Sequence, residues 1–143
     1  MAITSAICNS FKQEILEAEH NFTASTGDTF NLALYDSDAT LNKSTTAYTT
    51  SEELATTGGY TAKGNALTSV TPVLDSDTAV CDFSNTSWTS ASFTARGCLI
   101  FNDDNSDTSV CAIDFGGDKT VTSGTFTVEF PAAAASTAII QIA

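Results

Sequence analysis

The stretch Ser92–Phe115, SFTARGCLIFNDDNSDTSVCAIDF, decides the fold that the sequence predicts. Its two outer segments, 92–101 and 109–115, are rich in aromatic, β-branched and other apolar residues. Segments of this density are typical of central strands that are covered on both faces. The polar segment between them, 102–109, consists of Asn, Asp, Ser and Thr, most of which favour chain reversal. The stretch therefore predicts a β-hairpin with a solvated loop.

Shorter segments with apolar residues at alternate positions surround this hairpin. They lie at 29–35, 78–84, 124–130 and 138–143, and turn-rich segments separate them at 36–38, 56–60, 74–77, 116–119 and 123–124. A period of two is typical of strands with one buried face. Short strands at such intervals predict a mainly β fold, a single antiparallel β-sandwich of the jelly-roll or Ig-like kind, over residues 28–143.

The N-terminal segment has a different period. Steps of three and four residues separate its apolar positions, which are Cys8, Phe11, Ile15, Ala18 and Phe22. This spacing predicts one amphipathic α-helix over residues 4–22, which together with the sandwich forms a single domain, 1–143. A narrow stripe on about four turns is marginally stable alone. The helix must therefore pack on its own sandwich or on another chain.

The charge of the chain narrows the choice of partner. The chain has 143 residues, and 17 acidic against 5 basic side chains give a formal net charge of -12. Such a charge repels phosphate backbones, so we expect no nucleic-acid partner. Apolar runs such as 98–101 and 138–140 are too short for a signal peptide or a membrane span. We therefore expect no membrane partner and no export by the usual route.

Few residues of the chain are suited to catalysis or redox chemistry. Cys8, Cys81, Cys98 and Cys111 are widely spaced without a CxxC pair, which favours four buried thiols in a reducing cytoplasm over a zinc or dithiol site. His20 is the only histidine, and no nucleophile motif accompanies it. We interpret it as a residue that stabilises the end of the helix. The sequence predicts no catalytic residue, metal site or cofactor.

Two further patterns have an ordinary explanation. Asp103, Asn105 and Asp107 match the opening of a calcium loop, but Thr108 stands where that loop needs glycine. A solvated hairpin loop over 102–109 is favoured, and whether this loop or the DSD turns at 36–38 and 75–77 hold a surface cation stays open. Trp88 fits a core position better than an exposed platform for a ligand.

Seven blocks of the chain, in order, resemble a family of small virion-associated proteins of tailed bacteriophages. The blocks are ICNSFKQEIL at 7–16, GDTFNLALY at 27–35, TTGGYTAKGNAL at 56–67, CDFSNTSWTSASFTARGCLIFND at 81–103, AIDFGGDKT at 112–120, GTFTVEFP at 124–131 and AIIQIA at 138–143. The segment EAEH at 17–20 departs from the family pattern, in which a glycine often ends the helix, and this favours a longer helix here.

The resemblance implies a non-enzymatic structural protein of the virion, made in the host bacterial cytoplasm. From the acidic charge we infer a capsid decoration or cement protein on the outer capsid surface, with the major capsid protein and sister copies, as a homotrimer, for partners. The alternative is a tail-fibre or receptor-binding module that contacts the host surface. It predicts exposed aromatic residues among Tyr35, Tyr48, Tyr60 and Trp88.

The helix stripe has two possible roles under the decoration hypothesis. Phe11, Ile15 and Phe22 either anchor the chain on the capsid or on a sister copy, or they cover the sandwich of their own chain. The second role is slightly favoured.

Overall fold

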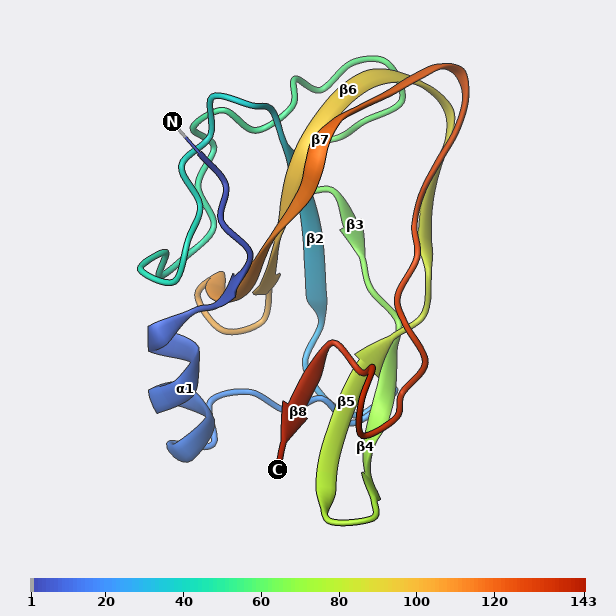
Figure 1. The fold of residues 1–143 in the computed structure, drawn as a ribbon. Helices are drawn as coiled ribbons and strands as arrows, with labels where there is room; N and C mark the ends of the chain where they lie inside the picture. The colour runs from blue at the N-terminus through green and yellow to red at the C-terminus, as the bar shows by residue number, and fades with distance from the viewer. Residues whose placement is uncertain (1) are drawn as a thin grey trace.

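The computed structural model describes residues 2–143 as two antiparallel sheets and one short helix (Figure 1). The larger sheet has the order β1 (Ala6–Ile7), β7 (Thr108–Val128), β6 (Thr86–Asn102), β2 (Phe30–Tyr35) and β3 (Asn65–Ala66). The smaller sheet has the order β4 (Ser69–Asp75), β5 (Thr78–Phe83) and β8 (Ile140–Ile142). The mainly β prediction is confirmed. The sheets are not closed, so the jelly-roll or Ig-like sandwich remains a prediction.

The predicted central hairpin is present and longer than expected. β6 and β7 pair from Thr86 with Val128 to Asn102 with Thr108, and the loop between them begins at Asp103. In Figure 1 the two strands rise together through the middle of the molecule, arch over its top and descend on the right. One ribbon therefore forms both the centre of the large sheet and a separate arm.

The segments 116–119 and 123–124 are not turns that separate strands, as the sequence predicted, but irregularities within β7. Ala95 pairs with Lys119 and Gly97 with Asp114, so four residues of β7 stand against one of β6. A bulge of this kind bends a strand without ending it. Gly116 accommodates the bend with φ of +77°, a conformation that glycine adopts readily. β6 continues past this point, so the pairing resumes on the far side.

Both faces of β2 are buried, although its sequence predicted a half-buried strand. Phe30, Leu32 and Leu34 lie in the main hydrophobic core, with α1 and the small sheet. Ala33 and Tyr35, on the other face, lie in a second apolar cluster. The segment 36–64 and the segment before β1 cover this cluster through the side chains of Ile3, Ala39, Leu41 and Tyr48. The long loop after β2 therefore acts as a second layer.

The helix α1 (Asn9–Leu16) is shorter than the predicted helix over 4–22. Before it, Ala6 and Ile7 pair with β7, and the amide of Cys8 donates to Val110 O at 3.0 Å. After it, Ala18 has φ of +62° and reverses the chain. The longer helix was therefore wrong because the sheet captures one end and a left-handed residue stops the other.

Phe11 and Phe22 of the predicted stripe cover the chain's own core, as the favoured interpretation held, and Ile15 is half-buried against it. Phe11 is only 3% exposed, and Phe22 reaches the same core beyond the helix end. Their rings pack edge to face at 5.9 Å, and Phe22 stacks on Phe30 at 4.3 Å. Phe11 and Phe22 therefore cannot be anchors for another chain.

We expect Phe11→Ala to lower the free energy of unfolding by about 3–5 kcal/mol, because it leaves a cavity in the core. Leu16→Ala, on the same helix, is the matched control: Leu16 is 87% exposed, and its replacement should change stability by less than about 0.5 kcal/mol. Urea denaturation followed by tryptophan fluorescence measures both. Equal losses in the two variants would contradict the assignment of the buried face.

Candidate functional site

His20 does not stabilise the end of α1, as the sequence suggested, but lies in a buried polar network. Its Nε2 donates to Glu14 Oε2 at 2.6 Å, and its Nδ1 accepts from the Asn102 amide at 3.1 Å. The side-chain amide of Asn102 also donates a hydrogen bond to Asp28 Oδ2 at 2.8 Å. Its oxygen, Asn102 Oδ1, accepts from the backbone amide of Asp104. Both ring nitrogens are thus engaged in contacts that attach the N-terminal segment to the hairpin.

The Asp-rich loop at 102–109 forms ion pairs with a lysine side chain of the same chain. The Lys63 ammonium lies 2.9 Å from carboxylate oxygens of both Asp103 and Asp107. The amide of Asn105 instead donates to Glu19. Of the three residues that suggested a calcium loop, Asp103 and Asp107 thus share Lys63, whereas Asn105 bonds to Glu19, and the hairpin-loop interpretation fits the structure.

The four cysteines are free and buried, in agreement with the sequence interpretation. Burial raises the pKa of all four thiols, to about 12 for Cys81 and Cys111. A thiol reacts and binds metals as the thiolate. These side chains therefore serve as small apolar core residues.

One group of carboxylates lies close together at the surface. Oxygens of Asp36, Asp38 and Glu52 are within 4.8 Å of one another, and this is the only such group in residues 2–143. Asp36 Oδ1 already accepts from the amide of Asp38 at 2.9 Å. Exposed acidic groups of this kind are common without an ion.

The aromatic residues that a receptor-binding module would expose are mostly in the core. Tyr35, Tyr60 and Trp88 are buried, and only Tyr48 reaches the surface in part. Glu53 accepts hydrogen bonds from the hydroxyls of Tyr48 and Tyr60. Burial and this carboxylate raise the pKa of Tyr48 to about 12. These rings hold the segment 36–64 in place and form no surface for a ligand.

One apolar surface feature lies at the lower end of the molecule. We call it the apolar end and define it by Ile15, Leu16, Pro72, Leu74, Ala79 and Ile142. Leu16, Leu74 and Ile142 are 87%, 74% and 56% exposed. A hollow of about 100 Å³ lies there, and its walls include side chains from α1, β4, β5 and β8. Exposed apolar groups that gather at one end of a molecule are typical of interaction sites.

Strand register explains why these side chains gather. Ala79 pairs with Leu74 on one side and with Ile142 on the other, so the three share one face of the small sheet. Two residues along β5, Cys81 pairs with Ile140 on the same face, and both are buried in the core. The small sheet is thus longer than the core that covers it. Its last row of apolar side chains has no cover within residues 2–143.

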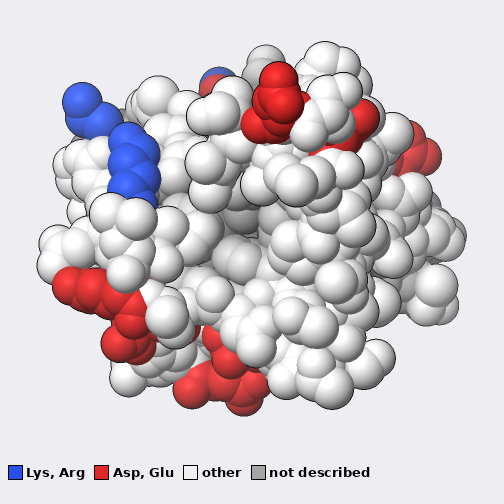
Figure 2. Space-filling view, turned by 90° about the horizontal axis from the view of Figure 1, so that it is seen from below, with Lys and Arg blue, Asp and Glu red and all other residues white. Residues whose placement is uncertain are grey.

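Figure 2 shows where charged side chains lie around the apolar end. Seen from below in Figure 2, the molecule is hollowed between the side that carries α1 and the side that carries β4 and β5. Acidic and basic side chains lie toward the edges of this view, and uncharged atoms surround the hollow. The end is therefore suited to contact with an apolar protein surface.

The apolar end was not predicted from the sequence. The segment 138–143 was predicted as a strand with apolar residues at alternate positions, but within it Ile140 is buried and Ile142 is exposed. Leu74 lies just before the polar DSD segment at 75–77, and this position near the end of a strand is the only signal that points to exposure. The sequence shows the apolar face of each strand but not where the core ends along it.

The search for known relatives gave no match among protein-family models, curated proteins or solved structures. Among residues 2–143, no helix has the length and apolar character needed to cross a membrane.

Asp82 on β5 carries a buried carboxyl group, and its effect on stability can be tested. It is 1% exposed, its Oδ1 accepts from the amide of Phe83 at 2.9 Å, and its Oδ2 has no partner among the described residues. Burial raises the pKa of this carboxyl group. The folded state thus holds the proton more tightly than the unfolded state. The stabilisation is fully present below the unfolded pKa, near 3.9, and is lost as the pH rises through the folded pKa.

We therefore expect Asp82→Asn to raise the free energy of unfolding at pH 7 by about 1–3 kcal/mol, because burial of a neutral amide costs less than burial of a carboxylate. The gain should shrink toward pH 3.5, where the carboxyl of the parent chain is protonated. Urea denaturation at several pH values measures the difference. Asp77→Asn, at an exposed position next to β5, is the control and should show no such gain. A gain for Asp82→Asn that is equal at both pH values would contradict the assignment.

Proposed function

We propose that this chain is a structural protein of a tailed-phage virion that decorates the outer capsid surface, and that it attaches through the apolar end. The observation that carries the proposal is the apolar row Leu74, Ala79 and Ile142, in which Leu74 and Ile142 are exposed and Ala79 is half-buried, together with the exposed Leu16 at the end of α1. Such a row is suited to binding a protein surface.

The net charge supports the choice of the outer surface. With -12 charges the chain is repelled by packaged DNA, so the inside of a filled head is unfavourable. The order of sequence blocks that resembles small virion proteins supports the choice of particle. Both arguments concern location, whereas the apolar end concerns attachment.

The proposed mechanism uses binding energy alone. Full burial of one Leu or Ile side chain stabilises a contact by about 1.5–3 kcal/mol. Three such residues give a modest contact for one copy, because association also costs translational and rotational freedom. Many copies on a symmetric shell act together, and each one that bridges two capsid subunits opposes their separation.

Mass spectrometry of purified particles tests the location. We expect this chain in the virions of the phage that encodes it, at hundreds of copies relative to the major capsid protein. Particles from a phage that lacks the gene should bind the added protein and resist heat better once they carry it. A chain that is absent from the particles contradicts the proposal, and a few copies per particle would favour the tail-fibre alternative.

Binding of the added protein to these particles also tests the apolar end. We expect Leu74→Asp and Ile142→Asp each to weaken binding at least about tenfold, because each places a charge in an apolar contact. Val73→Asp is the matched control. Val73 is 52% exposed, but it pairs with Val80 and thus lies on the opposite face of β4.

Circular dichroism and urea denaturation show whether all three variants remain folded. The proposal predicts that the Leu74 and Ile142 variants fold and lose binding, and that the Val73 variant folds and retains it. Equal binding by all three folded variants would rule out the apolar end as the attachment surface.

A further inference from the structure

The far half of β7 has an open edge. β7 pairs with β1 at Cys111 and Ala112, and the amide of Asp114 donates to Ser5 Oγ at 2.8 Å. From Lys119 to Val128, β6 is the only strand beside it within residues 2–143. An open edge of this kind can pair with another chain.

The other edge of the ribbon is covered. The segment 58–65 lies along the far half of β6: the amide of Ser92 donates to Gly58 O at 2.8 Å, and the Asn65 side chain donates to Ser87 O at 2.9 Å. The fold thus protects one edge of the arm and leaves the other free.

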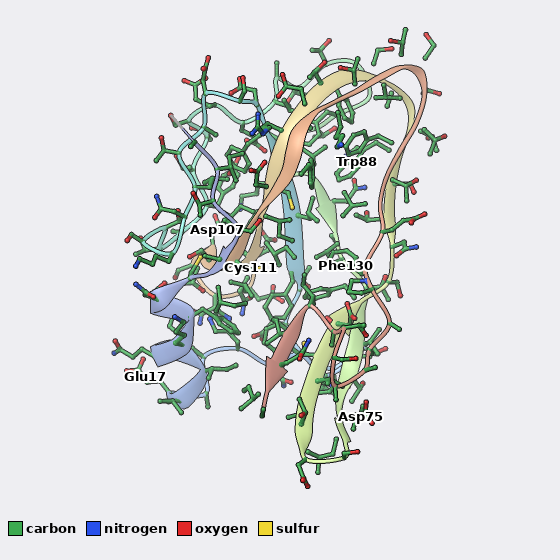
Figure 3. All side chains as sticks on the ribbon, viewed as in Figure 1. Glu17, Asp75, Trp88, Asp107, Cys111 and Phe130 are labelled. Atoms are coloured by element: carbon green, nitrogen blue, oxygen red, sulfur yellow. The ribbon has the colours of Figure 1, made fainter. Side chains whose placement is uncertain are left out.

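An apolar groove lies beside the open edge. It has a volume of about 470 Å³, and its walls include Ile113, Phe115, Phe126, Val128, Phe130 and Ile139. Figure 3 shows Trp88 and Phe130 in the space between the two halves of the arched ribbon. Lys119 and Glu129 also line the groove, and both are exposed. A partner strand at this edge would find main-chain groups and an apolar surface together.

The segment that forms this edge carries little charge. The chain has 17 acidic side chains, but Glu129 is the only one in residues 119–143, where Lys119 is the only basic one. The local net charge of this segment is therefore zero. Like charges across an interface cost binding energy, so two copies of an acidic chain associate best where the charge is lowest.

We propose that the open edge of β7 pairs with the same edge of a second copy, in antiparallel orientation about a two-fold axis. Lys119 and Glu129 lie at equal distances along the chain from Gly124. Pairing on either side of Gly124, where the bulge at 122–123 interrupts the ladder, therefore brings Lys119 near the partner's Glu129, and the symmetry repeats this pair at the other end. The two grooves come together and lose water. This dimer surface is separate from the apolar end and does not depend on the proposed function.

Sedimentation velocity on the full chain tests the state of association. We expect a dimer at concentrations of tens of micromolar. Lys119→Glu and Glu129→Lys each replace two attractive pairs by two repulsive ones, so each should raise the dimer Kd at least about tenfold. The double variant, Lys119→Glu with Glu129→Lys, restores opposite charges across the axis and should restore the dimer.

Lys43→Glu is the control, because Lys43 is exposed and its reversal changes the net charge as Lys119→Glu does. It should leave the dimer intact, and circular dichroism should show every variant folded. A monomer or trimer of the parent chain overturns the proposal. So does a dimer that the single reversals do not weaken, or a double variant that stays folded and monomeric.

Discussion

The pairing of β6 with β7 is the constraint on which the rest of the structure depends. The two strands supply 17 and 21 residues, and every strand of the large sheet attaches directly or through β2 to one of them. The bulge opposite Ala95 and Gly97 lets a single ribbon leave the sheet and arch over the core. A Cβ atom on Gly97 would lie 2.4 Å from Ile113 O, so the close approach of β6 to β7 at this point requires glycine. The long loop, the helix and the small sheet all pack against the arched ribbon or against the large sheet, in which the ribbon is central.

Polar side chains fix how these parts attach to the ribbon. Asn102, at the end of β6, is fully buried and connects His20 with Asp28. Glu53 in the long loop accepts from two tyrosine hydroxyls and from the amide of Lys63. Buried polar groups are stable only when they are paired, so each network specifies one position for its loop. His20, the only histidine, thus has a structural role: it helps to attach the N-terminal segment to the hairpin.

The sequence allowed the strands to be predicted because their apolar periods are local. β2, β5 and β8, and the cores of β6 and β7, lie where the alternation of Phe, Leu, Ile and Val placed them. The helix ends were not predictable from the stripe, because pairing of Ala6 with Ala112 is a contact between distant residues. The apolar end was missed for the same reason. Leu74 resembles any strand residue until the register shows that nothing covers it.

An acidic chain can still associate because its charge is uneven. At physiological salt, interactions between exposed charges are largely screened beyond about 8 Å, so local charge matters more than the total of -12. The C-terminal part, residues 119–143, carries one charge of each sign. It also provides the open edge of β7, much of the apolar groove and, through Ile142, one wall of the apolar end. The two surfaces suited to protein contact therefore draw on the same segment, which combines the lowest charge with uncovered strands.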